Sequence, residues 1–456
     1  MTQKDKDDKQ KRRYKTLTEN RIYPLLWRMA VPSMVGMMVS SVYSMTDTFF
    51  VGMLNKAELT AAVGIVFSFT SMIQAIGFWF GYGSGNYAAR QIGKGEITEA
   101  KRVISAALTL ALIVGIIISV GGVIFLRPLA RTLGAGISDE LMKATVSYLF
   151  ITLISVPVML ITNVLYNVLR LQGSAKDSMF GMLAGMLLNI LLDPIFILGF
   201  HMGVTGAALA SLLGQISGLA LLVVLSRKDG NVFGSIGSIS LCGMYLKKIL
   251  IGGAPNFCRQ GISSIATVFL NQAAGFYGEA GVAGVTVALR VISMAYALVI
   301  GFGQGFQPLC LVNYGAGKLE RVKRGFRDAL ITMTCFLLVA TFVLYRYADG
   351  IPALLIQDTD AIRVASDILK MQCLILPFMG YYILIGMLLQ NIGRFGVATL
   401  VTVAEDGLFL IPVVHILPIL YGYSGFVCCK CVAGMGALLF SLALGIGTWM
   451  KYLNRK

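Results

Sequence analysis

MLLNILLDPIF, at residues 186–196, places an amide and a carboxylate four positions apart in an otherwise apolar stretch. Removing an unsatisfied polar group from water costs free energy, so polar residues at such a place need a reason. If the stretch is helical, Asn189 and Asp193 lie on one face and present neighbouring oxygen atoms to a proton, a cation or a substrate. This face is the first candidate site.

The composition around this stretch is that of an integral membrane protein. Hydrophobic residues make up 57% of the chain and charged residues 13%, with a mean hydropathy of +0.78. Apolar runs of about 20 residues recur along the whole length, whereas transmembrane β-strands would be alternating segments of about ten residues. We therefore predict an all-α integral membrane fold with about twelve transmembrane helices.

An internal repeat divides the chain into two halves. QIGKGEITEAKRVISAAL at 91–108 aligns without gaps with NYGAGKLERVKRGFRDAL at 313–330, and GVTG at 203–206 recurs more loosely as GYSG at 422–425. Each half contains six predicted spans. Because six is even, the halves enter the bilayer in the same direction, as parallel repeats that form two six-helix lobes.

The predicted domain boundaries follow from this repeat and from charge. We expect, in order, a solvated cytoplasmic tail, an N-terminal lobe, a cytoplasmic linker, a C-terminal lobe and a basic cytoplasmic tail, at residues 1–21, 22–226, 227–248, 249–450 and 451–456. The distribution of the 38 Lys and Arg residues, which give a net charge of +16, is biased toward these tails and the even-numbered links. It therefore predicts cytoplasmic termini in a cell membrane and not a nucleic-acid partner.

Two carboxylates fall deep inside apolar spans of the first half, Asp47 and Asp193. Each would cost several kcal/mol in hydrocarbon unless it faced a cavity or a partner, so we expect both to line one. Such a pair can hold a proton, or be ionised by an arriving cation. The alternative is that these acids only hydrogen-bond neighbouring helices, and the same alternative is open for Asn163, Asn167 and Ser211.

The second half offers cationic and amide side chains inside its spans. Arg259 and Arg290 could balance charge or shape a cavity, although a structural ion pair or snorkelling explains them equally well. Gln260 and Asn271 are further cavity candidates.

Three charged residues near the end of the chain form a separate group. Glu405 and Asp406 stand near the start of the eleventh predicted span, and Lys430 lies one turn into the twelfth. The two spans are consecutive, and a lone Lys would be costly there. We therefore predict that Lys430 pairs with one of the two acids.

Motifs of soluble enzymes are absent. GAGKL at 315–319 lacks the earlier glycine and the final Ser or Thr of a phosphate-binding loop, and the chain has two histidines. We expect no enzyme activity, no cofactor and no structural metal. A polytopic membrane enzyme would need a His, Asp or Lys cluster near the bilayer surface, and a receptor or scaffold would leave the two intramembrane acids dispensable.

The chain resembles the multidrug and toxic compound extrusion (MATE) family of secondary transporters. The resemblance is carried by VPSMVGMMVSSVYSMTDTFFVG at 31–52, LRLQGSAKDSM at 169–179, LLNILLDPIFILGFHMGVTGAALAS at 187–211 and NYGAGKLERVKR at 313–324. It extends over residues of about 22–450 and implies two six-helix lobes that alternate between inward and outward openings. It also implies export of organic, often cationic drugs in exchange for protons or sodium ions.

Site residues follow from the same resemblance, motif by motif. Asp47, Asn189, Asp193 and Ser211 correspond to a cation-coupling cluster in the N-terminal lobe, which is also a possible sodium site. Tyr43 would complete its hydrogen bonds together with Asn163, and Asn167 is a further candidate for supporting the cation site.

The second half departs from the family pattern. Some branches carry acidic residues in the seventh and tenth spans, where this chain offers Arg259, Gln260, Asn271, Gln390 and Asn391. Coupling is therefore assigned to the first lobe. We predict a monomeric efflux antiporter for lipophilic cations, with a flippase or exporter of a lipid-linked or endogenous metabolite as the alternative.

Overall fold

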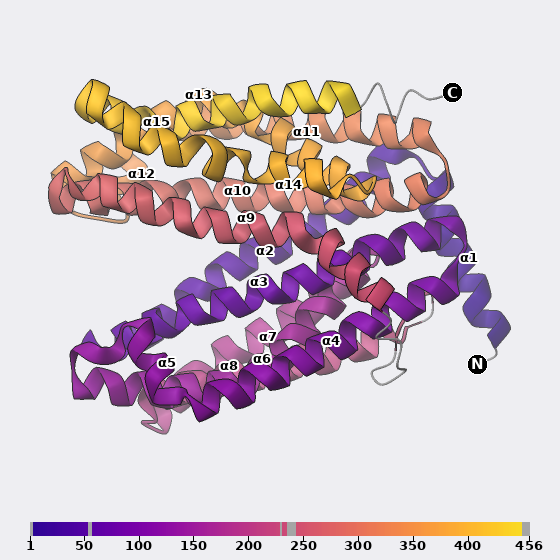
Figure 1. Cartoon of the computed structure of the whole chain (residues 1–456), viewed down its shortest axis with the longest axis horizontal. Coiled ribbons are helices and arrows are strands. Elements are labelled where there is room, and N and C mark those ends of the chain that lie inside the picture. The colour runs from indigo at the N-terminus through magenta and orange to yellow at the C-terminus, as the bar shows by residue number, and fades with distance from the viewer. Residues whose placement is uncertain (1–2, 53–56, 229, 235–242, 449–456) are drawn as a thin grey trace. The chain divides into compact units, whose positions relative to one another are not determined.

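The computed structural model describes the backbone of residues 3–52, 57–228, 230–234 and 243–448, and the side chains of residues 9–40, 58–228, 230–234, 243–445 and 447. The described chain is almost entirely helical, and in Figure 1 the long helices of each half lie lengthwise beside one another. The first half contains α1 (Gln3–Glu19), α2 (Ile22–Gly52), α3 (Ala57–Lys94), α4 (Ile97–Ile124), α5 (Leu126–Leu133), the 3₁₀ turn η1 (Ala135–Ile137), α6 (Asp139–Leu171), α7 (Ala175–Pro194), the π-helix η2 (Ile195–Gly199) and α8 (Gly203–Ser226).

The second half repeats this order of long helices. It contains α9 (Gly243–Gly275), α10 (Gly278–Gly315), α11 (Leu319–Arg346), α12 (Gly350–Ala353), α13 (Thr359–Asn391), α14 (Phe395–Val403), the π-helix η3 (Ala404–Leu410) and α15 (Ile411–Thr448). Glycines with positive φ recur at matching places: Gly95 and Gly317 after α3 and α10, and Gly173 and Gly393 after α6 and α13. The repeat is therefore present in the backbone.

The number of spans agrees with the prediction. Ten helical stretches in the described residues are long and apolar enough to cross a bilayer, and the longest, Phe395–Gly445, has 51 residues. This stretch contains two spans, because Gly422 has non-helical angles and a Cβ on Gly425 would lie 2.1 Å from the Leu417 carbonyl oxygen, so the chain turns back. α9 is not one of the ten apolar stretches, but at 33 residues it is long enough to cross a bilayer, and with it the described residues contain twelve spans. The all-α membrane fold is confirmed.

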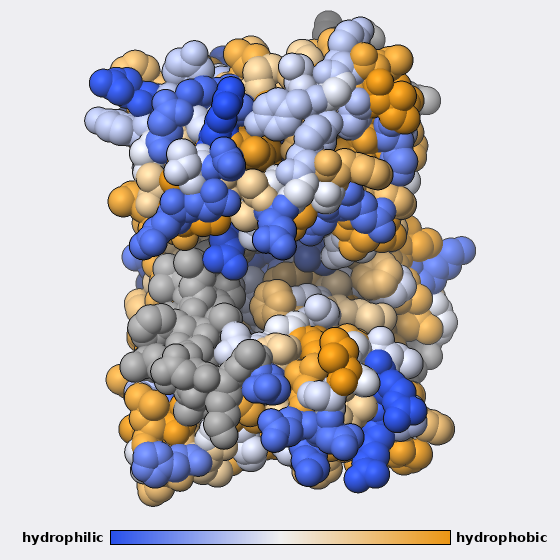
Figure 2. Space-filling view, turned by 90° about the vertical axis from the view of Figure 1, so that its left-hand side faces the viewer, coloured by the Kyte–Doolittle hydropathy of each residue, from blue (hydrophilic) through white to orange (hydrophobic). Residues whose placement is uncertain are grey.

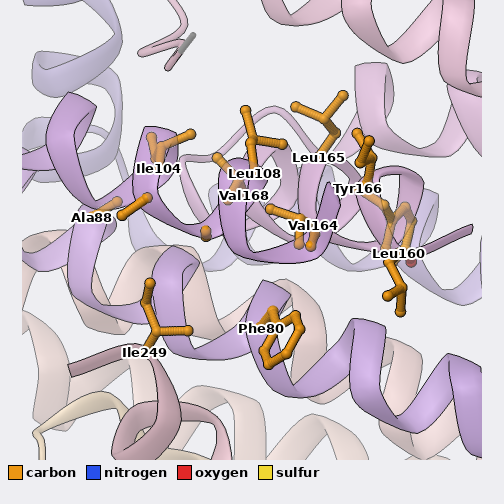
Figure 3. Close-up of a cluster of buried hydrophobic side chains, with 14 of the residues drawn as sticks. Phe80, Ala88, Ile104, Leu108, Leu160, Val164, Leu165, Tyr166, Val168 and Ile249 are labelled. Atoms are coloured by element: carbon orange, nitrogen blue, oxygen red, sulfur yellow. The ribbon is translucent and has the colours of Figure 1, made fainter. Parts of the chain in front are cut away.

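Apolar side chains form the core of the first half between α3, α4 and α6. Figure 3 shows Phe80 of α3 and Leu108 of α4 beside Leu160 and Val164 of α6, with Ile249 of α9 nearby. Glycines of α3 allow α6 to pack closely against it: a Cβ on Gly81 would lie 2.8 Å from the Asn163 carbonyl oxygen. The second half has its own core, in which Leu270, Val285, Ile368 and Phe426 meet.

The chain forms two compact units that do not coincide with the predicted boundaries. Unit 1 contains residues 1–20, 35–253 and 315–317, and unit 2 contains the rest. The chain therefore passes from one unit to the other inside α2 and inside α9, close to Pro32 and Pro255, and not in the linker at 227–248. Close glycine contacts hold both exchanged segments: a Cβ on Gly305 would lie 2.3 Å from Ala30 Cα in unit 2, and a Cβ on Gly83 would lie 1.9 Å from the Ile249 carbonyl oxygen in unit 1.

The N-terminal segment differs from the solvated tail that was expected. It forms α1, and Leu17 is buried against the turn at Gly173, where an added Cβ would lie 3.1 Å from the Leu17 side chain. Arg13 donates hydrogen bonds to the Gly230 carbonyl oxygen and to Asn231 Oδ1. The segment is thus docked on the linker and on the end of α6.

Outward-facing side chains are largely apolar along the long helices. Ile117 of α4 and Phe342 of α11 are among the exposed large hydrophobic residues, as expected for surfaces that contact lipid. Figure 2 looks onto helix ends, where hydrophilic residues gather. This contrast between helix sides and helix ends is the one that a bilayer requires.

Candidate functional site

Asn189 and Asp193 lie on the last turns of α7, one above the other on the buried face. Their side chains are 1% and 0% exposed, as the spacing of four residues predicted. Pro194 follows directly, and because proline lacks an N–H it disturbs the α-helical ladder. The chain continues as the π-helix η2, which ends with a hydrogen bond of 2.9 Å from Phe200 N to the Ile195 carbonyl oxygen.

Ser211 of α8 completes this group across the helix pair. The Asn189 amide fits its neighbours in one orientation, in which its nitrogen donates to Asp193 Oδ2 over 3.2 Å. Its oxygen then accepts from the Ser211 hydroxyl at 3.1 Å and from the Ser211 backbone N–H at 2.9 Å. We orient the amide this way because the opposite assignment leaves the amide oxygen facing acceptors. The three residues form one continuous polar cluster.

Glycines allow α7 and α8 to approach closely enough for these contacts. A Cβ on Gly214 would lie 2.6 Å from the Gly185 carbonyl oxygen and 3.0 Å from Asn189 Cβ. A Cβ on Gly185 would in turn lie 2.7 Å from the Gly214 carbonyl oxygen. Small residues at these positions therefore set the distance at which Asn189 can reach Ser211.

The structure places Asn163 and Asn167 elsewhere, on the face of α6 that packs against α3. Each amide donates to a carbonyl one turn earlier in its own helix, over 2.9 Å for Asn163 and 2.8 Å for Asn167. Asn167 Oδ1 also accepts from the buried Arg170 at 2.9 Å. These contacts serve helix packing, and a supporting role at the cation site stays a prediction for both.

Two predicted members of the cluster fall on residues whose side chains are outside the described part of the chain. Asp47 and Tyr43 both lie in α2. Their contribution to the site stays a prediction from the sequence.

The candidates in the second half are dispersed. Asn271 of α9 and Arg290 of α10 are exposed, whereas Arg259 and Gln260 are partly buried. Arg259 is close enough to Asp406 to act on it electrostatically. It therefore belongs with the acidic pair that follows.

Unit 2 contains a second charged cluster, and the predicted ion pair is present in it. Lys430 Nζ of α15 lies 3.2 Å from Asp406 Oδ1 of η3, with both side chains about 80% buried. Glu405, next to it, is 9% exposed and accepts a hydrogen bond of 2.9 Å from the Tyr382 hydroxyl of α13. The ion pair was predicted because the two spans are consecutive and a lone Lys would be costly there.

Two members of these networks, Tyr382 and Arg170, were not singled out from the sequence. Tyr382 is one of many aromatic residues in apolar spans, and nothing in its neighbourhood marks it as the partner of Glu405. Arg170 is 1% exposed and lies over the Tyr82 and Tyr166 rings, at 5.1 and 5.9 Å from their centroids. A basic residue inside the helical pattern before GS at 173–174 is the signal that could have found it.

Comparison with known proteins gives a match in both halves. The MatE family model matches residues 32–195 and 255–416. The multidrug export protein MepA of Staphylococcus haemolyticus (strain JCSC1435) is 27% identical over 408 residues, which cover 89% of each chain. MepA of Staphylococcus aureus (strain MSSA476) is 26% identical over 405 residues, with the same coverage.

Solved structures share the fold over nearly the whole chain. A MOP superfamily transporter from Pyrococcus furiosus Vc1 (DSM3638) superposes with a TM-score of 0.88 at 25% identity and covers 97% of this chain and 98% of its own. The outward-facing conformation of a multidrug resistance MATE family transporter gives the same TM-score, identity and coverage. Because the family model covers most of both repeats, this chain belongs to the MatE family and is a membrane transporter, not an enzyme.

Proposed function

We propose that this transporter is a secondary active efflux antiporter that exports organic, lipophilic cations in exchange for protons or sodium ions by alternating access. The observation that carries the proposal is the buried carboxylate of Asp193, which is joined through Asn189 to Ser211 inside unit 1. Intramembrane carboxylates mark ion pathways because their burial is costly unless they bind something.

The chemistry of the cluster suits a small cation. Asp193 supplies a carboxylate, Asn189 an amide and Ser211 a hydroxyl, and oxygen atoms of these kinds are ligands for hard cations. Asp47 adds the second carboxylate in this proposal. Protonation of either acid would remove a negative charge from the same place, so a proton and a sodium ion would act alike. Either ion drives transport if it binds the two lobe arrangements with different affinity.

Further parts of the proposal rest on the family and on the charge pattern. The MepA relatives carry the name multidrug export protein, which supports drugs as the exported class. The positive tails and even-numbered links support cytoplasmic termini in a cell membrane. We keep the two lobes predicted at 22–226 and 249–450, with the start of α2 and the start of α9 exchanged between them, as the two moving bodies of a monomer that needs no cofactor other than the coupling ion.

The test is efflux of a lipophilic cationic dye from sealed proteoliposomes, with proton and sodium gradients imposed separately. Asp193→Asn should abolish gradient-driven efflux. Asp177→Asn is the matched control, because Asp177 lies on the same helix but pairs with Lys228 over 3.4 Å near the start of α7. It should transport like the wild type.

Two outcomes would contradict the proposal. If Asp193→Asn retained full gradient-driven efflux, the coupling role of this carboxylate would be wrong. If the wild type moved no dye under either gradient but translocated a fluorescent lipid, the alternative of a lipid-linked substrate would replace drug export.

A further inference from the structure

Ser211 and Lys430 occupy the same position in the two repeats. Gly203 and Gly422 both have φ of +57°. Gly203 is the first residue of GVTG and begins α8, and Gly422 is the first residue of GYSG and marks the kink inside α15 at which a new helix begins. Ser211 lies eight residues after the first of these glycines and Lys430 eight residues after the second. Positive φ at a fixed place in both halves is a backbone marker of register that does not depend on side-chain similarity.

Both residues make a polar contact with the preceding helical segment of their own repeat. Ser211 of α8 reaches Asn189 of α7 at 3.1 Å. Lys430 of α15 reaches Asp406 of η3 at 3.2 Å. The same pair of helices therefore holds a polar site in each unit, but a hydroxyl in unit 1 is replaced by an ammonium group in unit 2.

The charges around Lys430 balance without any bound ion. Asp406 and Glu405 provide two negative charges, and Arg259 of α9 provides a positive charge near Asp406 in addition to Lys430. The other titratable groups facing the cluster are Tyr382 of α13, which donates to Glu405, and Tyr296 of α10, which are neutral near neutral pH.

The stem of Lys430 is anchored in apolar surroundings. It borders a small pocket lined by Leu270, Val285, Leu289, Ile292, Ile368, Phe426 and Val427. Methylene groups suit such a lining, while the ammonium group emerges toward Asp406. A methionine at this position could fill the same space without the charge.

We propose that Lys430 is a built-in replacement for a coupling cation: its ammonium group permanently occupies a monovalent-cation site formed by Asp406 and Glu405 in unit 2. Without Lys430, this site would take a sodium ion or a proton. The comparison with Ser211 rests on the proposed function, which assigns a cation site to unit 1. The chemistry of the unit 2 site is argued from its own residues and does not depend on that function.

Tethering favours the ammonium group of Lys430 over a free ion at this position. An ammonium group on the same chain has a high effective concentration at the site, since its binding costs no translational entropy. Its removal leaves one negative charge in excess in a partly buried place, which is costly until a cation or a proton neutralises it. A variant without the ammonium group should therefore bind one more cation than its parent.

The experiment uses the full chain in lipid nanodiscs with the unit 1 acids neutralised by Asp47→Asn and Asp193→Asn. Lys430→Met is added to this background. Binding of radioactive sodium is measured directly, and proton uptake is measured by titration in weakly buffered solution without sodium. We expect the protein with Asp47→Asn and Asp193→Asn to bind no sodium. The protein that also carries Lys430→Met should bind about one more sodium ion, or take up about one more proton, per molecule.

Two control variants identify the site that produces the gain. Lys430→Arg keeps a tethered cation and should show no gain. Lys430→Met with Asp406→Asn restores charge balance without the ammonium group and should also lose the gain. A folded Lys430→Met variant that gains neither ion would overturn the proposal.

Poor folding of Lys430→Met gives an equally decisive result. Sodium chloride, compared with choline chloride, or mild acid should then raise its thermal midpoint, because ligands of the folded state stabilise it. The proposal fails if neither sodium chloride nor mild acid raises the thermal midpoint of Lys430→Met, while the variant that also carries Asp406→Asn is stable. In that case a free cation cannot replace the ammonium group. These results are independent of dye efflux by the wild type, so the proposal and the transport function fail separately.

Discussion

Replacing Gly214 with alanine should damage the candidate cation site without changing any of its polar groups. The added methyl carbon would lie 2.6 Å from the Gly185 carbonyl oxygen and 3.0 Å from Asn189 Cβ. Both neighbours belong to α7, and one of them is backbone, so the clash cannot be relieved by a rotamer change. The helices must move apart.

The distance by which α7 and α8 must separate decides whether the contact between Asn189 and Ser211 survives. An ordinary contact of about 3.4 Å requires α7 and α8 to separate by about 0.8 Å, and the 2.9 Å contact between the Asn189 amide and Ser211 N would lengthen to about 3.7 Å. That exceeds hydrogen-bond distance. Overpacking costs about 1–3 kcal/mol and a lost hydrogen bond about 1 kcal/mol, so the free energy of unfolding should fall by about 2–4 kcal/mol.

Thermal unfolding in detergent and gradient-driven dye efflux in proteoliposomes measure the two consequences. Gly121→Ala in α4 is the matched control, because a Cβ at Gly121 meets nothing within 4 Å. Alanine is the better helix former, so this control should be neutral or slightly stabilising. If Gly214→Ala behaved like Gly121→Ala in both assays, close approach of α7 and α8 would not be what holds the cluster together.

Three further predictions concern other contacts. Asp406→Asn and Lys430→Met, measured singly and together without sodium, should be non-additive in unfolding free energy by about 1–3 kcal/mol, and additivity would refute the ion pair. Leu17→Ala should release α1 from unit 1, seen as faster amide hydrogen exchange in α1 with the rest of unit 1 unchanged. Lys370 holds the pKa of Asp349 below its ordinary value of 3.8, so the contribution of this exposed pair is full above that pH and is lost as the pH falls below it. Asp349→Asn should therefore lower the stability by less than about 1 kcal/mol at neutral pH and by nothing in strong acid.

Hydropathy and the internal repeat were sufficient to predict the helical membrane fold, because apolar runs of span length have few alternatives in a bilayer. The pairing of Lys430 with an acid was also predictable, since consecutive spans are neighbours and a lone ammonium group is costly. The contact between Asn189 and Ser211 followed from the family resemblance and not from spacing, because periodicity gives faces of helices but not which faces meet.

Other features left little trace in the sequence. The docking of α1 depends on one buried leucine, Leu17, in a segment otherwise dominated by charge. The exchange of α2 and α9 between the units is set by backbone contacts at glycines such as Gly305, which look like ordinary packing positions in the sequence. Such features arise from tertiary contacts that a local pattern does not encode.

The two repeats show which constraints are fixed by the backbone and which are free to change. Gly203 and Gly422 keep the same positive φ because the turn into the following helix requires it. The residue eight positions later is not constrained by the turn, and it is a serine in one repeat and a lysine in the other. Under the two proposals made for these sites, ion binding changes the charge of unit 1 alone, because unit 2 carries its own cation. An ion can shift a conformational equilibrium only by binding to, or leaving, a site. The free energy that couples ion binding to transport would therefore come from the site between α7 and α8.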